Sequence, residues 1–225
     1  MLSIVNVKLL TMERSISIDK LEKKIILHLC ADIGSDSRFY QLDDDYEVIM
    51  IGEEIGVENY TPPANVHGII ANPPCTEFST ADYSRDSDTE KGMFLVNHCL
   101  RIIGEANPKW WMLENPATGT LKKFLGKAKE VYQPWEFGSS WTKRTALWGN
   151  FTMPKKTVLN RRDVVLNPNI YIRARDTMPS LVMLHKSVIN FLPEYEWCKY
   201  RIKKDADLRS LCSAGFAEEF YKSNL

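Results

Sequence analysis

The sequence predicts an α/β fold built on a central, mostly parallel sheet, and two observations lead to this prediction. Short apolar runs of strand length recur along the chain, at residues 25–29, 47–51, 69–71 and 109–113. Such runs are typical of strands that are buried on both faces. A helical apolar pattern separates the third run from the fourth, with side chains at Met93, Val96, Leu100 and Ile103. Strands that alternate with helices favour parallel pairing.

The composition is that of a soluble globular protein, and the length allows one large domain or one domain with a small attachment. The 225 residues include 44% hydrophobic and 26% charged side chains, which is ordinary for a globular chain. No apolar stretch approaches the ~20 residues that cross a bilayer, so no membrane partner is expected. The five cysteines form an odd set without close pairs. This pattern favours a reducing, cytoplasmic compartment and argues against a disulfide framework or a metal site.

Charge is unevenly distributed although the formal net charge is zero. Residues 41–60 hold seven acidic side chains and no basic one, whereas residues 143–175 hold eight basic side chains against Asp163 alone. The basic segment could contact phosphate groups. It could equally be a solvated surface whose balancing acids lie nearby in space.

The third apolar run leads directly into a stiff loop that carries a thiol. The strand expected at residues 69–71 ends before Pro73 and Pro74, because proline fixes φ and lacks a backbone donor. Cys75 is therefore expected just past the carboxyl end of a strand, where open α/β sheets bind their ligands. A lone cysteine beside a turn is more often structural. A second reactive group near Cys75 is therefore needed before this loop indicates a catalytic site.

A second strand end supplies that partner. The run at residues 109–113 is expected to leave the sheet through Glu114, Asn115 and Pro116. A glutamate at a strand end is more often a surface residue than a catalytic one. If the two strands are neighbours, however, the thiol of Cys75 and the carboxyl of Glu114 share one crevice.

The first two runs predict half of a nucleotide-binding unit. A loop of small and capping residues at 30–37 follows the first run and precedes a short helix near residues 38–42. The second run, at residues 47–51, is followed by Glu53 and Glu54. A carboxylate at that strand tip can accept both hydroxyls of a ribose, and Glu53 is the favoured candidate. A generic strand-to-helix turn would look similar.

The rest of the chain has weaker patterns. Further expected elements are helices at residues 121–130, 181–191 and 216–223, and strands at residues 2–10, 15–18, 131–137 and 145–151. The last of these strands is expected near the edge of the sheet.

The thiol-bearing loop resembles a known catalytic loop. Residues 72–79 read Asn-Pro-Pro-Cys-Thr-Glu-Phe-Ser, which is similar to the nucleophile loop of DNA cytosine carbon-5 methyltransferases. Three further stretches match a compact, phage-type version of that family in the same order, at residues 110–116, 142–151 and 215–224. The resemblance implies a Rossmann-like, S-adenosylmethionine-dependent methyltransferase fold in the cytoplasm of a bacterial or phage-infected cell.

The resemblance also implies a division of the chain. Residues 1–153 and 205–225 would form the catalytic core, with residues 1–20 as a hairpin extension. Residues 154–204 would form a short basic segment, a reduced version of the family's larger target-recognition domain. The target sequence and the oligomeric state are left open.

The implied chemistry is covalent catalysis at cytosine. Carbon-5 of cytosine is a poor nucleophile until a thiolate adds at carbon-6. The resemblance assigns the thiolate to Cys75 and a proton donor to ring nitrogen 3 to Glu114. Arg144 would orient the base or its carbonyl, with a phosphate contact as the alternative. The implied substrate is DNA whose target base leaves the stack, and the short basic segment leaves single strands and free cytosine nucleotides open.

The implied cofactor is S-adenosylmethionine. The residues expected to bind it are Cys30, Ala31, Gly34, Glu53, Glu58, Asn72, Pro73 and Asn224. Asn224 would lie near the methionine part of the cofactor, at the end of a helix packed beside the cofactor pocket.

Two positions depart from the family pattern. His28 stands where the family commonly has aspartate, and Asp32 stands where glycine is frequent. Because a side chain at Asp32 could crowd the cofactor, a methyltransferase-like fold kept as a binding or decoy module is an alternative. An exocyclic-amine methyltransferase is a further alternative, but such enzymes need an aromatic side chain where this chain has Cys75.

Overall fold

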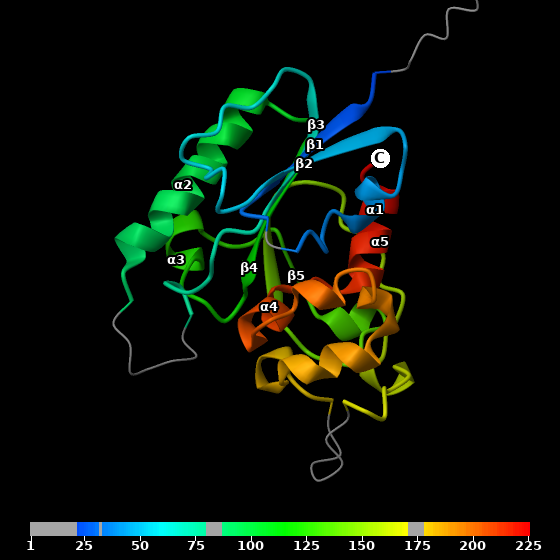
Figure 1. Ribbon diagram of the computed structural model, residues 1–225. Coiled ribbons are helices and arrows are strands. Elements are labelled where there is room, and N and C mark those ends of the chain that lie inside the picture. The colour runs from blue at the N-terminus through cyan, green and yellow to red at the C-terminus, as the bar shows by residue number, and fades with distance from the viewer. Residues whose placement is uncertain (1–21, 32, 80–86, 171–177) are drawn as a thin grey trace, which may run out of the picture.

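The protein forms a three-layer α/β structure around one six-stranded sheet (Figure 1). The computed structural model describes residues 22–31, 33–79, 87–170 and 178–225, so Asp32 and the hairpin expected within residues 1–20 lie outside the described residues. The strands are β1 (Lys24–Leu29), β2 (Tyr46–Ile51), β3 (Val66–Ala71), β4 (Trp110–Pro116), β5 (Glu130–Tyr132) and β6 (Thr145–Asn150).

The sheet has the order β2-β1-β3-β4-β6-β5. Its first four strands pair in parallel, and β6 runs antiparallel to both β4 and β5. The predicted α/β fold with a mostly parallel sheet is therefore confirmed.

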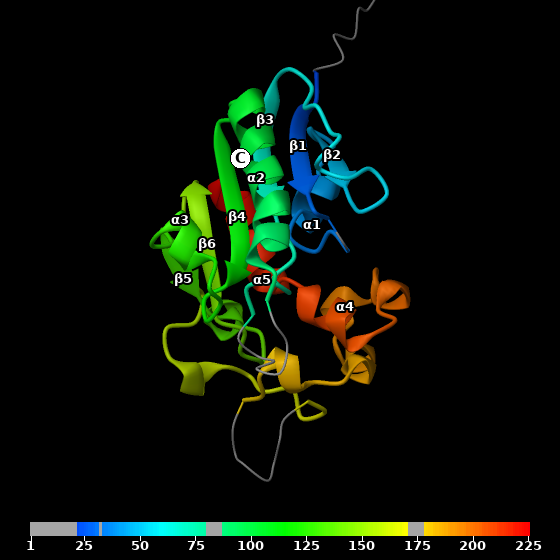
Figure 2. The same cartoon turned by 90° about the vertical axis from the view of Figure 1, so that its left-hand side faces the viewer.

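Helices cover both faces of the sheet (Figure 2). The α-helices are α1 (Arg38–Gln41), α2 (Thr89–Ala106), α3 (Lys122–Leu125), α4 (Asp205–Ser210) and α5 (Ala214–Ser223). Short 3-10 segments occupy Pro134–Phe137, Arg161–Asp163, Leu181–Met183, Lys186–Phe191, Pro193–Tyr195 and Lys199–Arg201. The helices α2 and α3 lie on one face, and α1 and α5 lie on the other.

Alternation along the strands divides the core into two clusters. Ile69 and Leu113 pack on the side of α2, whereas Ile70 and Met112 pack on the side of α5. Both clusters are fully apolar, as expected for parallel strands that are covered on both faces. Gly68 is required in β3, because a Cβ there would lie 2.2 Å from the Trp110 ring.

A third apolar cluster lies beside the carboxyl ends of the parallel strands. Its members come from the loop after β1 (Ile33), from Trp141, from the described part of residues 154–204 and from the start of the C-terminal region, including Leu208. Tyr195 anchors it, because its hydroxyl donates to the Cys212 carbonyl at 2.6 Å. The proposed boundaries at residues 154 and 204 stay predictions.

Several elements of the structure differ from the sequence-based predictions. Glu114, Asn115 and Pro116 are not an exit loop but the last residues of β4, because they pair with β6. The helix expected at residues 121–130 is only the four-residue α3, which ends at Gly126 with φ of +75°.

Other corrections concern the segments around β6. The strand expected at residues 131–137 shrinks to β5, because Pro134 starts a 3-10 turn. The strand β6 is not at the edge, since β5 lies outside it. The helix expected at residues 181–191 is two separate 3-10 segments, and α4 was not predicted. Within the described residues, no helix has the length and apolarity needed to cross a bilayer.

Candidate functional site

The two predicted loops meet at one edge of the sheet. The strands β3 and β4 are parallel neighbours, with Ala71 opposite Leu113, so their carboxyl ends lie side by side. The Asn115 amide donates to the Pro73 carbonyl at 2.9 Å and ties the two strand ends together. The structure thus brings Cys75 and Glu114 to the same edge. Cys75 is solvent-exposed and its thiol is free.

A largely buried ion pair lies next to this thiol, and Cys75, Glu114 and Lys143 make up the cluster that we call the crevice. The Lys143 Nζ lies 3.5 Å from Glu114 Oε1, and the two side chains are only 17% and 13% exposed. Burial is the largest influence on Lys143 and lowers its pKa, but the charges of Glu114, Asp36 and other neighbours outweigh it. The pKa of Lys143 is consequently raised, so this side chain remains a cation.

The thiol of Cys75 is placed between opposing charges. Desolvation by the surrounding protein raises its pKa, and the neighbouring Glu114 carboxylate raises it further. Lys143 acts in the opposite direction. The thiolate is the reactive form of cysteine, and Lys143 is therefore the group that favours the nucleophile.

Strand alternation explains why Lys143, and not the predicted Arg144, faces Glu114. In the antiparallel pair β4–β6, Glu114 lies directly opposite Leu147, and alternate residues share a face. Lys143 and Arg144 directly precede β6, and the same alternation continued back from Leu147 through Thr145 puts Lys143 on the side of Glu114. Arg144 points to the other face, where it lines a separate pocket. Without the register between β4 and β6, the sequence could not distinguish these two basic neighbours.

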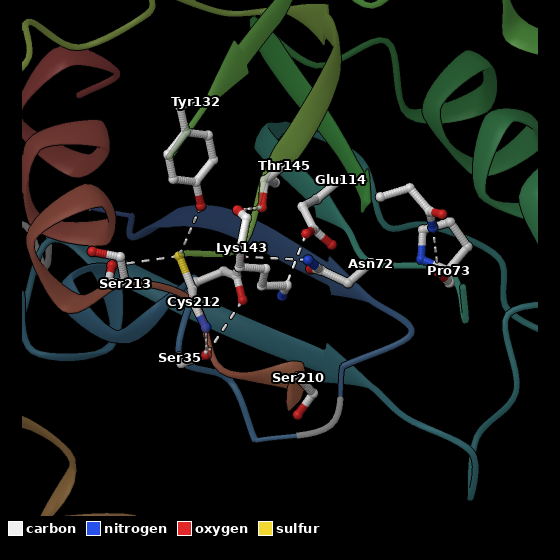
Figure 3. Close-up of polar contacts among 12 residues, drawn as sticks. Ser35, Asn72, Pro73, Glu114, Tyr132, Lys143, Thr145, Ser210, Cys212 and Ser213 are labelled. Carbon is white, nitrogen blue, oxygen red and sulfur yellow. Dashed lines mark hydrogen bonds and ion pairs between the residues drawn. The ribbon is translucent and has the colours of Figure 1, made fainter. Parts of the chain in front are cut away.

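The segment that leads into α5 lies on the other side of Glu114 and Lys143 from Pro73 (Figure 3). The backbone amide of Cys212 donates to Ser35 Oγ at 3.0 Å, and its sulfur lies 3.8 Å from the Tyr132 hydroxyl. Burial raises the pKa of the Cys212 thiol far above its ordinary range. This thiol therefore stays protonated and is not a second nucleophile. These three residues were missed in the sequence because they come from three distant segments.

His28 joins the loop after β1 to the loop after β3. Its Nε2 lies 2.8 Å from Asn72 Oδ1 and its Nδ1 lies 2.9 Å from Ser37 Oγ. The Asn72 amide also donates to Asp36 Oδ1 at 3.4 Å. The histidine that departs from the family pattern is therefore a buried hydrogen-bonding residue that holds both loops in place.

The other expected cofactor residues gather at the carboxyl ends of β1 and β2. Cys30 has φ of +52° and Gly34 has φ of +84°, so the chain turns sharply after β1. The backbone amide of Ala31 donates to the Ile51 carbonyl at 3.1 Å, which holds this loop beside the tip of β2. Glu53 and Glu58 are both solvent-exposed beyond that tip.

Asn224 lies elsewhere. Its side chain accepts from the Thr152 amide at 2.8 Å and donates to the Thr152 carbonyl at 2.9 Å. Thr152 follows the end of β6, and Asn150 pairs with Trp111 near the amino end of β4. Asn224 is thus at the opposite edge of the sheet from Glu114, where it docks the end of α5.

The basic segment is partly neutralised by nearby acids. Lys143 pairs with Glu114, and Lys156 Nζ lies 2.6 Å from Glu136 Oε1. Arg173 and Arg175 lie outside the described residues. In the part of the chain that is described, no group of His, Cys, Asp and Glu side chains is arranged to hold a metal ion.

Comparison with known proteins supports the resemblance. Residues 45–130 match the profile of the family described as C-5 cytosine-specific DNA methylase. A frog virus 3 protein described as "Probable DNA (cytosine-5)-methyltransferase" is 28% identical over 120 residues, which cover 47% of this chain and 55% of that protein. The type II methyltransferase M.AquIA of a Picosynechococcus strain is 38% identical over 69 residues, which cover 31% of this chain and 27% of that protein.

A solved structure, described as a DNA modification methyltransferase encoded within an E. coli prophage, shares 14% identity with this chain. Its TM-score is 0.44, over 66% of this chain and 55% of that chain, which is too low to bear on the argument. The matches to the two curated relatives span about half of one and a quarter of the other. Over residues 45–130, which contain both Cys75 and Glu114, this chain resembles the C-5 cytosine-specific DNA methylases.

Proposed function

We propose that this protein is a DNA cytosine carbon-5 methyltransferase that uses S-adenosylmethionine. One observation carries the proposal: the Cys75 thiol, the Glu114 carboxyl and the Lys143 ammonium share one crevice at the carboxyl ends of adjacent parallel strands. Ligands of open α/β sheets bind at such ends, and a nucleophile next to an acid is what activation of a pyrimidine requires.

The thiol begins the reaction. The Cys75 thiolate adds to carbon-6 of cytosine, which breaks the aromatic ring and makes carbon-5 nucleophilic. Since burial and Glu114 raise the pKa of the thiol, only a fraction is ionised at neutral pH. The ammonium of Lys143 increases that fraction, because it is the opposing charge beside the thiol.

Glu114 assists at ring nitrogen 3: in its protonated form it donates a proton there and stabilises the negative charge that the thiolate addition pushes onto the base. Its Oε1 atom is buried, and within the described residues it has the 3.5 Å ion pair with Lys143 Nζ but no hydrogen bond. A buried carboxyl oxygen favours a ligand that supplies a donor, and the exocyclic amine of cytosine is such a donor. After methylation, a water molecule accepts the carbon-5 proton and the bond between carbon-6 and sulfur breaks, which releases the Cys75 thiolate. The proton on nitrogen 3 returns to Glu114, and the aromatic ring is restored.

The strand ends beyond β1 and β2 fit the methyl donor. A Cβ at Gly52 would lie 3.0 Å from the Ala31 carbonyl oxygen, so a bare backbone is needed where the two loops approach. The carboxylate of Glu53 is free to accept both hydroxyls of a ribose at this tip. Cys30, Ala31 and Gly34 would line the adenosine and methionine parts, and Asn72 and Pro73 would separate them from the base. S-adenosylmethionine, when bound there, supplies an electrophilic methyl group.

Methyl transfer from labelled S-adenosylmethionine tests the proposal. Wild type and Cys75→Ser are incubated with duplex DNA, single-stranded DNA or 2′-deoxycytidine 5′-phosphate, and the digested products are analysed by mass spectrometry. We expect 5-methylcytosine from wild type with at least one substrate and none from Cys75→Ser. If wild type and Cys75→Ser yield equal product, Cys75 is not the nucleophile. If neither yields product while a known methyltransferase does, the enzyme assignment fails.

A covalent trap tests the intermediate separately. DNA that contains 5-fluorocytosine should leave wild type attached to the base, because fluorine at carbon-5 cannot depart as the proton does. The mass of the protein should increase by that of the oligonucleotide plus one methyl group. The adduct should be absent in Cys75→Ser, whereas Cys212→Ser should still form it.

A further inference from the structure

A pocket with a basic rim lies on the opposite side of β4 and β6 from the crevice. It has a volume of about 190 Å³, and its walls come from the segment after β4, from α3 and its exit, and from β5 and β6. Three cations line it, Lys122, Lys127 and Arg144. The apolar part of the wall includes Trp148. These elements stand next to one another in Figure 2.

The three cations have no acidic partners. Across residues 22–31, 33–79, 87–170 and 178–225, no carboxylate forms an ion pair with Lys122, Lys127 or Arg144, and no acidic side chain lines the pocket. All three residues are solvent-exposed. Three like charges around one concavity repel one another, and a bound anion relieves that repulsion.

Backbone contacts hold the cations in position. The Trp148 Nε1 donates to the Gly126 carbonyl at 3.0 Å, which fixes the turn just before Lys127 against β6. The Ala117 amide donates to the Arg144 carbonyl at 2.9 Å. Lys122 Nζ donates to the Ala117 carbonyl at 3.4 Å, so its ammonium faces the same segment. The rim is therefore a built arrangement and not three unrelated surface charges.

The pocket is connected to the crevice by a short piece of chain. Pro116, one of its lining residues, is two positions after Glu114. The loop that follows is tied to the nucleophile loop, because the Thr120 amide donates to the Phe78 carbonyl at 2.8 Å. A strand that places one base in the crevice can therefore bring a flanking phosphate toward this rim.

The geometry points to a phosphate-binding site formed by Lys122, Lys127 and Arg144, whose ligand is a phosphodiester of the nucleic-acid strand that carries the target cytosine. Phosphate contacts position a strand without reading its sequence. The apolar wall suits the sugar next to the phosphate, and the volume exceeds that of a phosphate group alone. This inference rests on the proposed nucleic-acid substrate.

Equilibrium binding without a methyl donor tests this site. The probe is a fluorescein-labelled, cytosine-containing single-stranded oligonucleotide, and its anisotropy is measured from 50 to 200 mM salt. The pocket variant is Lys122→Ala/Lys127→Ala, and the matched control is Lys123→Ala, a neighbouring lysine of α3 that does not line the pocket. We expect the pocket variant to bind about tenfold more weakly at 50 mM salt and its salt slope to fall by about 0.7, the value for one single-strand phosphate. Lys123→Ala should change affinity less than twofold.

The source of the phosphate is distinguished by two small ligands, 2′-deoxycytidine 5′-phosphate and deoxycytidine. If only oligonucleotide binding weakens in the pocket variant, the ligand is a phosphodiester of the strand. If the nucleotide also binds more weakly while deoxycytidine does not, the site takes a free phosphate, and the strand assignment is wrong. Equal binding by wild type and pocket variant, equal loss in Lys123→Ala, or no binding of any ligand by wild type overturns the inference. Oligonucleotide binding without methyl transfer would instead count against the proposed chemistry alone.

Discussion

Lys143 and Arg144 are consecutive residues, yet they belong to two regions with opposite electrostatics. Lys143 enters the crevice, where it is buried and paired with Glu114. Arg144 enters the pocket, where it is exposed and joins two more cations without an acid among the described residues. A strand that is covered on both faces sends adjacent side chains to opposite layers, so one short stretch serves both regions.

The difference has a chemical meaning. A buried ion pair keeps its charges at fixed places because losing either partner is costly, and this suits a site that must control a thiol and a proton. Exposed cations are individually worth little to stability, but together they attract an anion. The crevice should therefore respond strongly to single substitutions, whereas the pocket should respond mainly to salt.

The largest effect is expected from Glu114→Gln. Loss of the acid should lower kcat by roughly 10²–10⁴-fold. The same substitution should make iodoacetamide alkylate Cys75 faster in the protein without ligands, because the carboxylate that raises the pKa of the thiol is gone. Peptide mass spectrometry reports the alkylation of Cys75 by itself. Arg144→Gln is the matched control and should leave that alkylation rate unchanged. An equal change of the alkylation rate in both variants would show that Arg144 acts on Cys75 as Glu114 does, which contradicts the separation of the two regions.

Lys143→Met should be the most damaging substitution for stability. It leaves the Glu114 carboxylate buried without a partner, a situation that costs about 3–5 kcal/mol, and urea unfolding measures the loss. Alkylation of Cys75 should become slower, because the group that lowers the pKa of the thiol is removed. The double variant Lys143→Met/Glu114→Gln should recover most of the stability. Failure to recover it would mean that Lys143 stabilises the fold through other contacts.

The pH dependence of Cys75 alkylation should show the balance of charges in the crevice. A raised pKa means that the thiolate fraction is small at neutral pH and grows about tenfold per pH unit below the pKa. The rate in wild type should therefore still be rising at pH 9, above the ordinary thiol pKa of about 8.5. In Glu114→Gln the curve should move toward lower pH. A plateau in wild type by pH 8 would show that Lys143 outweighs both burial and the carboxylate.

The smallest effect is expected from Trp148→Phe. This change removes the hydrogen bond from the indole to the Gly126 carbonyl, at a cost of about 0.5–1.5 kcal/mol, because Gly126 is exposed and water can replace the lost donor. The turn that presents Lys127 should loosen, so oligonucleotide binding should weaken slightly. Alkylation of Cys75 should not change, since the crevice is on the other side of the sheet. A faster or slower alkylation rate would show that the two regions are coupled.

Much of the sheet could be predicted from the sequence because its strands are buried on both faces. The runs that became β1, β2 and β3 are continuous and apolar, and α2 has the expected helical period. The helix predicted at residues 121–130 was wrong for a physical reason. Its helical pattern is interrupted by Gly126, whose backbone conformation and contact with Trp148 favour a turn. The role of Asn224 as a cofactor residue stays a prediction, although its contacts with Thr152 place it at the far edge.

What the sequence determined by itself is the pair of strand ends, one followed by the Cys75 thiol and one carrying the Glu114 carboxyl, although it placed Glu114 in a loop and not in β4. Local signals suffice there, because proline pairs and apolar runs act over a few residues. Tertiary structure alone decided that Lys143 completes the crevice, that Arg144 leaves it, and that Lys122 and Lys127 join Arg144. Those outcomes depend on the register between β4 and β6 and on contacts between distant segments. The residue pattern within a single strand contains no information about either.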